Sequence, residues 1–165
     1  MKTRKNVKGF TLVELIVVIA IIGVLAAILV PSMLGYVKKA NQSAVNSNAK
    51  TIYNAAATAV TDCDTAGATV FSAANKVTGK LTIAVAAAGT PSCSDATTTF
   101  VDSFKQAVGE STLKGLTDVE LGIVKNACTA AICKKGNYMG AYPEAVQNGG
   151  SASIDGTTGA LTVTS

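Results

Sequence analysis

Glu14 is the residue whose chemistry fits its surroundings least. It lies in a run of 21 residues, Phe10 to Val30, in which only Thr11, Glu14 and Gly23 are not plainly hydrophobic. A helix of that length is about 30 Å long, which is enough to cross the hydrocarbon core of a bilayer. An acid inside such a helix is costly to insert and marks a functional site by default. The run therefore predicts a membrane-spanning helix whose carboxylate needs a cationic partner.

Basic residues gather in front of the apolar run and set its orientation. Four positive side chains and no negative ones precede it: Lys2, Arg4, Lys5 and Lys8. The rest of the chain has ten lysines against ten acidic residues, so the net charge of +4 belongs to the leader. Because positive residues hold a terminus in the cytoplasm, the part after the span is predicted to be exported. No basic stripe with interleaved aromatic residues occurs in the sequence, so no nucleic-acid site is predicted.

Three interpretations of this N-terminus differ in where the chain is cut. A cleaved signal peptide has a shorter apolar core, and Pro31 lies where its cut would fall. An uncleaved signal anchor fits the length but leaves Glu14 unexplained. A cut between Gly9 and Phe10 removes only the basic leader and keeps the anchor. That cut also turns the amide of Phe10 into an amine that is largely cationic at neutral pH.

The segment KGFTLVE, residues 8–14, resembles the processing site of type IV prepilins. Gly9 precedes the cut, Phe10 follows it, and Glu14 is the fifth residue of the mature chain. The apolar run through Pro31 is similar to the N-terminal helix of the pilins. The resemblance implies cleavage after Gly9 and N-methylation of Phe10 by a prepilin peptidase. It also implies a helical filament of many copies, built by an inner-membrane assembly platform and a cytoplasmic ATPase.

The position of Glu14 leaves three partners open for its carboxylate. Glu14 is four positions after Phe10, so the new amine of a neighbouring helix or of the same chain is within reach. Glu14 also lies near the start of the span, where it can extend toward the headgroups. We prefer the neighbouring copy, because the matching residue of the resembled family has that role. Cleavage then acts as an assembly switch that creates the cation.

Gly23 and Pro31 mark a weak part of this helix. Glycine is a poor helix former, and Pro31 lacks the donor that would bond to the carbonyl of Ala27. The stretch from Gly23 to Pro31 is therefore expected to bend or melt on packing. The resemblance favours unwinding in the filament, and a simple kink at the membrane exit is the alternative.

Four cysteines lie beyond the apolar run: Cys63, Cys93, Cys128 and Cys133. An even count in an exported domain predicts two disulfides. Of three possible pairings, proximity in the sequence favours Cys63–Cys93 and Cys128–Cys133, and the alternative is four reduced, buried thiols. Because the sequence has no histidine and no Cys-x-x-Cys pair, no metal site is predicted.

The exported part is predicted to be α+β, with one long helix packed against an antiparallel sheet. Apolar and small residues recur every three or four positions after Pro31, so the helix is predicted to continue to about Thr61. The predicted buried stripe is Val37, Asn41, Val45, Ala49, Ile52, Ala56 and Val60. A stripe of this kind needs a partner, and strands late in the chain predict a sheet.

Alternating apolar residues predict three strands, at 80–85, 119–124 and 160–164. Residues 100–108 fit a short helix closed by Gly109. Residues 63–75 and 136–150 are predicted loops. The predicted layout is a cleaved leader at 1–9, a transmembrane and filament-core segment at 10–31, and an exported domain at 32–165.

The pattern predicts a structural protein rather than an enzyme. The sequence has no histidine to act as a base, so no catalytic residue and no cofactor are predicted. The resemblance implies a major pilin, a subunit of an extracellular type IV pilus that supports adhesion, twitching motility or DNA uptake. The near alternative is a pseudopilin of a type II secretion or competence system, which has the same N-terminal signature. The alternative of another class is a monomeric, membrane-anchored binding protein with an uncleaved leader.

Overall fold

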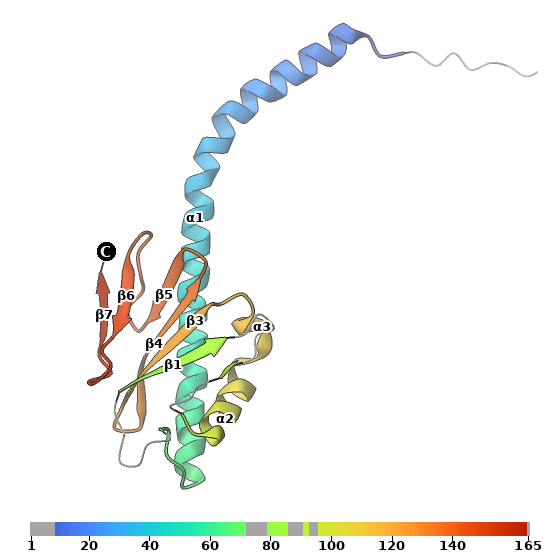
Figure 1. The fold of residues 1–165 in the computed structure, drawn as a ribbon. Coiled ribbons are helices and arrows are strands. Elements are labelled where there is room, and N and C mark those ends of the chain that lie inside the picture. Colours follow the sequence, from blue (N-terminus) through green and yellow to red (C-terminus); the bar gives the residue numbers. More distant parts are fainter. Residues whose placement is uncertain (1–8, 72–78, 86–90, 93–95, 165) are drawn as a thin grey trace, which may run out of the picture. The chain divides into compact units, whose positions relative to one another are not determined.

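The computed structural model describes residues 9–71, 79–85, 91–92 and 96–164 (Figure 1). Its first helix, α1, is Leu12–Thr65, and two short helices follow, α2 (Thr98–Val108) and α3 (Glu110–Leu113). Within these residues the strands are β1 (Gly79–Val85), β2 (Pro91–Ser92), β3 (Asp118–Val124), β4 (Ala127–Lys135), β5 (Tyr138–Tyr142), β6 (Ser151–Ile154) and β7 (Leu161–Thr164). The chain divides into two units, Met1–Lys38 and Lys39–Ser165.

The predicted long helix is confirmed, and it extends to Thr65. In the second unit most of the predicted stripe is buried: Val45, Ala49, Ile52, Ala56 and Val60. Val37 and Asn41 are exposed, so the prediction was wrong for these two residues. Gln42 is buried in place of Asn41, because its side-chain amide donates to two backbone carbonyls of the sheet side.

The antiparallel sheet is also confirmed. Its strand order is β2-β1-β3-β4-β5, and every neighbouring pair is antiparallel. β6 and β7 form a separate antiparallel pair. The three predicted strands correspond to β1, β3 and β7, and the predicted short helix corresponds to α2. Gly109 follows α2 with a φ of 72°, a conformation that glycine adopts without strain.

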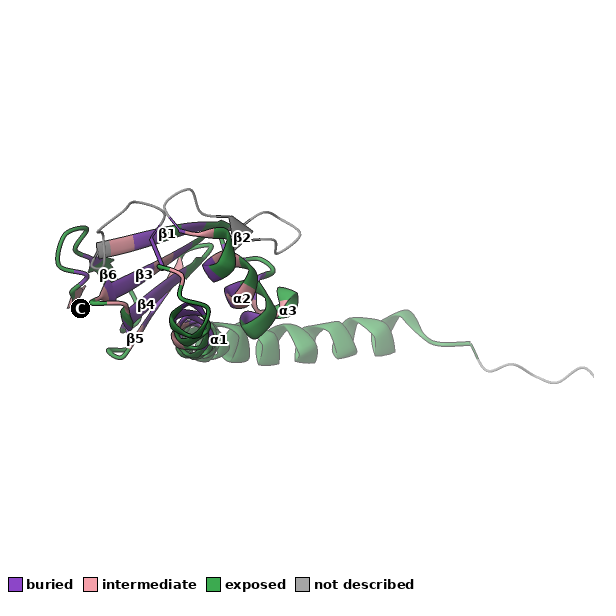
Figure 2. Ribbon diagram, turned by 90° about the horizontal axis from the view of Figure 1, so that it is seen from below, coloured by how far each residue is buried: buried purple, intermediate pink, exposed green. Residues whose placement is uncertain are grey.

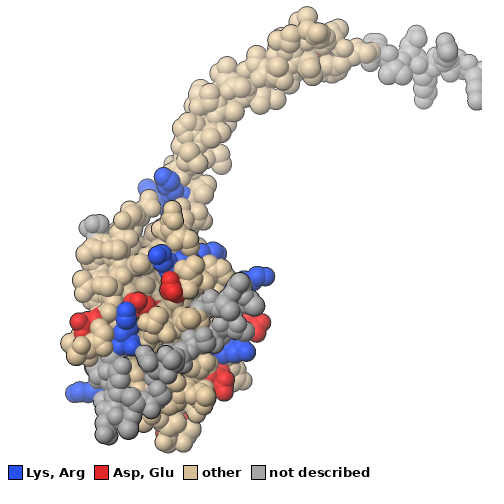
Figure 3. Space-filling view, in the orientation of Figure 1, with Lys and Arg blue, Asp and Glu red and all other residues tan. Residues whose placement is uncertain are grey.

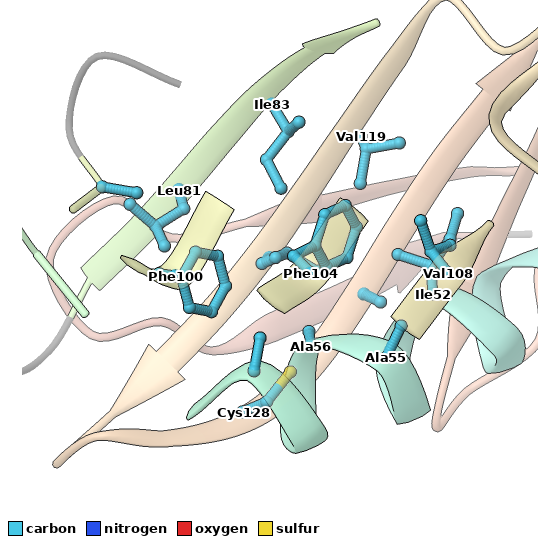
Figure 4. Packing of buried hydrophobic residues seen from close by; sticks show 14 of the residues in the cluster. Ile52, Ala55, Ala56, Leu81, Ile83, Phe100, Phe104, Val108, Val119 and Cys128 are labelled. Carbon is cyan, nitrogen blue, oxygen red and sulfur yellow. The ribbon is translucent and has the colours of Figure 1, made fainter. Parts of the chain in front are cut away.

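The main core lies between the helices and one face of the five-stranded sheet (Figure 2). Phe100 and Phe104 of α2 are fully buried, with ring centroids 6.1 Å apart. Figure 4 shows them between sheet residues such as Leu81 and the small side chain of Ala56 on α1. Burying a phenylalanine side chain contributes about 1.5–3 kcal/mol, so these two rings hold α2 against the sheet.

The hairpin β6–β7 covers part of the opposite face of the sheet. Ala130 and Ile132 of β4 and Ala141 of β5 form a second buried cluster with Val146 and Ile154. β4 is therefore buried on both faces. A strand of this kind shows no alternation of apolar and polar residues, which is why its sequence did not reveal it.

The predicted loop at 136–150 is wrong in part, because it contains β5. Gly136 has a φ of 57° and lies in the tight turn that returns the chain from β4 to β5. β5 then pairs with β4 from Tyr138 to Tyr142. This strand has only five residues, YMGAY, so its apolar pattern is too brief to distinguish it from a loop. The predicted loop at 63–75 includes the last turn of α1, and residues 72–78 lie outside the described residues.

Two polar side chains of α1 close the free edge of β5. Gln42 Nε2 donates to the carbonyl oxygen of Met139 at 2.7 Å and to that of Val146 at 3.1 Å. Asn46 Oδ1 accepts from the backbone N–H groups of Ala141 and Val146, and its Nδ2 donates to the carbonyl of Val146. We call Gln42 and Asn46 the polar clasp. It satisfies backbone groups that an open sheet edge would leave unpaired.

Candidate functional site at the start of the long helix

The carboxylate of Glu14 caps the helix that carries it. Glu14 Oε2 accepts hydrogen bonds from the backbone N–H and the hydroxyl of Thr11, at 2.9 and 2.7 Å. In return the N–H of Glu14 lies 3.3 Å from Thr11 Oγ1. This reciprocal pattern is a capping box, and it satisfies donors that the first turn of a helix leaves unpaired. Glu14 thus has a partner in its own chain before any cleavage occurs.

Thr11 is a residue of this site that the sequence reading missed. The signal was present, since a threonine three positions before a glutamate at a helix start is the spacing of a capping box. The second carboxylate oxygen, Oε1, accepts no hydrogen bond within the described residues. An ionised carboxylate has acceptor sites on both oxygens, so the cap leaves Oε1 available to a second donor.

The surface around Glu14 is apolar on every side of the helix. Among the described residues, all exposed large hydrophobic side chains lie between Phe10 and Val37. Phe10 itself is 77% exposed. Figure 3 shows no charged side chain on the visible face of this segment. By length and composition, α1 is the helix of the described chain that can cross a membrane. A surface of this kind needs lipid or other protein to cover it.

The helix continues through both residues of the predicted weak part. Pro31 lies inside α1, and Gly23 has nothing within 4 Å of the place where a Cβ would stand. Near the proline, Ser32 Oγ donates to the carbonyl of Leu29 at 2.8 Å. Bending or unwinding between Gly23 and Pro31 on packing stays a prediction about the assembled state.

The predicted Cys128–Cys133 disulfide is not present. Both residues lie in β4 and carry free thiols, and five residues of strand separate their Cα atoms by roughly 16 Å. A disulfide requires Cα atoms within about 7 Å of each other. Cys63 is also buried, and its predicted partner Cys93 lies outside the described residues. The Cys63–Cys93 pairing stays a prediction.

A β-bulge places both thiols of β4 on the helix side of the sheet. Gly122 pairs with Ala130 and Ile123 pairs with Cys128, so Thr129 has no partner across the ladder. Residues five apart in a regular strand point to opposite faces, and one extra residue reverses this. Cys128 and Cys133 therefore both belong to the main core.

The buried thiols of β4 are expected to react slowly. Burial raises the pKa of both Cys128 and Cys133 to about 12. At pH 8 their thiolate fraction, and hence their alkylation rate, is about a thousandfold below that of an unfolded thiol. We expect iodoacetamide to modify Cys128 and Cys133 of the reduced full chain in detergent only after guanidinium is added, as followed by peptide mass spectrometry.

The same pKa values set the sign of a pH dependence. Below the unfolded pKa of about 8.5 both states hold the two protons, so the thiols do not make stability depend on pH. Above it the unfolded thiols ionise while the buried ones stay neutral until about pH 12, so the free energy of unfolding falls as pH rises.

The labelling experiment has a clear contrary outcome. Equal rates of iodoacetamide modification with and without guanidinium would contradict the buried positions of Cys128 and Cys133.

Comparison with known proteins agrees with the geometry of this segment. The family described as the prokaryotic N-terminal methylation motif matches residues 4–30. The chain is 54% identical over 43 residues to the type IV wide pilus major component PilA4 of Thermus thermophilus, which is 26% of this chain and 33% of that relative. It is 46% identical over 48 residues to the type IV major pilin protein PilA of Myxococcus xanthus, covering 29% and 22%.

A third relative belongs to a secretion system. The chain is 42% identical over 55 residues to the type II secretion system core protein G of Escherichia coli, covering 33% of this chain and 38% of that relative. The chain thus spans less than half the length of each of these relatives. No solved structure matches the chain significantly.

The N-terminal motif and the fold together define the class of protein. A methylation motif opens a long helix that is apolar at its start, and an antiparallel sheet packs on the later part of that helix. This is the architecture of a type IV pilin-like protein. Within that class, the relatives are named as major pilins and as a secretion-system core protein.

Proposed function

We propose that this chain is a major pilin, made as a membrane-anchored precursor and assembled into an extracellular type IV pilus. Cleavage between Gly9 and Phe10 removes the leader, and N-methylation modifies the new amine of Phe10. The pilus then supports adhesion, twitching motility or DNA uptake. The partners are other copies of the chain, a prepilin peptidase, and an assembly platform with a cytoplasmic ATPase. We expect no catalytic activity.

The exposed apolar surface from Phe10 to Val37 carries this proposal. No residue of this described stretch is buried by the subunit itself. Lipid covers such a surface before assembly, and the same surface of other copies can cover it afterwards. The free Oε1 of Glu14 supports an ionic contact with the new amine of a neighbouring copy, while Thr11 continues to hold Oε2.

A mass measurement of the mature N-terminus tests the proposal. We expect surface material sheared from cells that make the chain to begin with N-methylated Phe10. Membrane fractions of a strain without prepilin peptidase are the control, and they should retain residues 1–9. A chain that keeps residues 1–9 in all fractions would instead be the monomeric, anchored binding protein.

A second candidate function is a pseudopilin of a type II secretion or competence system. The similarity to the core protein G of Escherichia coli favours it. Both candidates predict the same mature N-terminus, so mass spectrometry does not separate them. The length and abundance of native filaments do: long, abundant filaments at native expression identify a major pilin.

A further inference from the structure

We propose that a hollow in the second unit, Lys39–Ser165, receives the acidic end of α1 from a second copy of the chain. Because this unit lies within the predicted exported domain, we call it the exported unit. The hollow has a volume of about 380 Å³ and lies between α1 and the turn from β4 to β5. Its polar lining is Asn41, Asn48, Lys135, Asn137 and Tyr138, and Val45 is part of its floor. We call it the amide hollow. The inference rests on the proposed filament function and names one contact between exported domains.

The lining of the amide hollow offers donors and no acid. Three carboxamides, one ammonium group and one phenol surround it. In the part of the chain that the structure describes, none of these five side-chain polar groups makes a hydrogen bond or an ion pair. Lysine, asparagine and tyrosine can all donate to a carboxylate. The hollow therefore has the chemistry of a site for a carboxylate-bearing partner.

The acidic end of α1 provides such carboxylates. Asp62 and Asp64 are exposed in the last turn of the helix, and that turn contains no basic residue. The C-terminus of a helix carries a partial negative charge, so two carboxylates there destabilise the isolated subunit unless a cation comes close. No hydrogen bond or ion pair to either carboxylate occurs within the described residues. The subunit thus leaves this negative end unneutralised.

Most other described acids of the exported unit are paired, hydrogen-bonded or close to a lysine within it. Glu120 forms an ion pair with Lys80 at 3.0 Å, and Asp155 accepts three hydrogen bonds within its own turn. Three further acids have a lysine beside them: Asp102 with Lys105, Glu110 with Lys114, and Asp118 opposite Lys134. Glu144 has no such neighbour, but it is a single charge away from any helix end. Among the described residues of this unit, Asp62 and Asp64 are therefore the carboxylates that gain most from an outside cation.

The two features lie far apart along one helix, which determines how two copies meet. Ala44, beside the hollow, and Cys63 are nineteen positions apart, so the distance along α1 is about 29 Å. Two parallel copies that are offset by this distance bring the acidic end of one copy to the hollow of the other. The contact joins different surfaces of the two copies, and repeated translation never closes it into a ring. A contact of this type extends an open filament.

Charge reversal and charge exchange in the full chain test this contact in cells that assemble it. We expect Lys135→Glu alone, and Asp62→Lys with Asp64→Lys, each to lower sheared filament about tenfold, because each places like charges against each other. We expect the chain that carries all three substitutions to return to within about twofold of the wild type, because the exchange restores opposite charges. Glu144→Lys is the matched control and should leave the yield unchanged, because Glu144 is an exposed acid away from the acidic end of α1.

Folding is checked in parallel, so that a loss of filament reports on assembly. No variant should unfold below the temperature of the wild type in detergent, since the substituted residues are exposed and lysines at the C-terminus of α1 suit the helix dipole. Normal filament from either single-site reversal, or no recovery in the triple variant, would overturn the inference while the wild type still formed filaments. A wild type without filaments would instead overturn the proposed function.

Discussion

A Glu14→Gln chain should leave about a hundredfold less sheared filament than the wild type, although it inserts into the membrane and loses its leader normally. The yield falls because the amine of Phe10 on a neighbouring copy then stays buried without its countercharge. Glutamine keeps an acceptor oxygen at the same position. The two donors of Thr11 that hold Glu14 Oε2 can therefore still be satisfied. The substitution removes the charge and retains the cap.

The measurement needs three readings from one culture. Carbonate-resistant membrane association reports insertion, mass spectrometry of the membrane fraction reports cleavage after Gly9, and immunoblots of sheared material report filament. Glu144→Gln is the matched control, because it makes the same chemical change at an exposed carboxylate of the exported unit. Wild-type filament from Glu14→Gln would remove the assembly role. Failure of the Glu14→Gln chain to insert would instead show that Glu14 acts in membrane targeting.

Gly140→Ala is expected to destabilise the exported unit by about 3 kcal/mol, because backbone atoms cannot give way to an added methyl group. A Cβ at Gly140 would overlap the carbonyl group of Val45 and would lie 2.8 Å from the backbone nitrogen of Asn46. Both belong to α1, where the helical hydrogen bonds fix the backbone. β5 would have to move away from the helix.

That movement also breaks the polar clasp. Gln42 and Asn46 reach Met139, Ala141 and Val146 only while β5 lies against α1. Buried donors and acceptors that lose their partners cost roughly 1–3 kcal/mol each, so part of the loss comes from the clasp. We expect the full Gly140→Ala chain in detergent to unfold at a midpoint more than 10 °C below that of the wild type, as followed by circular dichroism. A loss of about 3 kcal/mol produces a shift of about this size in a domain of this length.

A second glycine provides the control. Gly156 has open space where its Cβ would stand, so Gly156→Ala should change stability by less than about 0.5 kcal/mol. A Gly140→Ala chain as stable as Gly156→Ala would show that β5 and α1 are not in close contact.

The predictions for the start of the molecule rest on local determinants, and the methylation motif at residues 4–30 and the long apolar helix agree with them. The basic leader, the span and the cut site depend on residue type and on neighbours within about four positions. The same holds for the capping box of Thr11 and Glu14, whose T-x-x-E spacing was readable although it was overlooked. The strands β1, β3 and β7 could be found for a similar reason, since one apolar face alternates along each of them.

Only the tertiary structure decided how β4, β5 and the thiols are arranged. β4 is buried on both faces, so its sequence shows no alternation of apolar and polar residues. The single extra residue of its bulge, Thr129, decides which face of the sheet Cys128 occupies. The stapled hairpin predicted for Cys128 and Cys133 was wrong because an extended strand holds the two apart.

The partners of the exported unit also come from distant parts of the chain. Asn46 and Val146 are 100 positions apart, and no pattern of spacing joins them. The sequence by itself predicted which segment spans a membrane, because transfer of a segment from water to an apolar phase depends on its own residues. The predicted cut between Gly9 and Phe10 came from the resemblance of residues 8–14 to a prepilin processing site. The clasp, the amide hollow and the state of the buried thiols depend on which remote residues the packed core brings together, and only the three-dimensional arrangement contains that information.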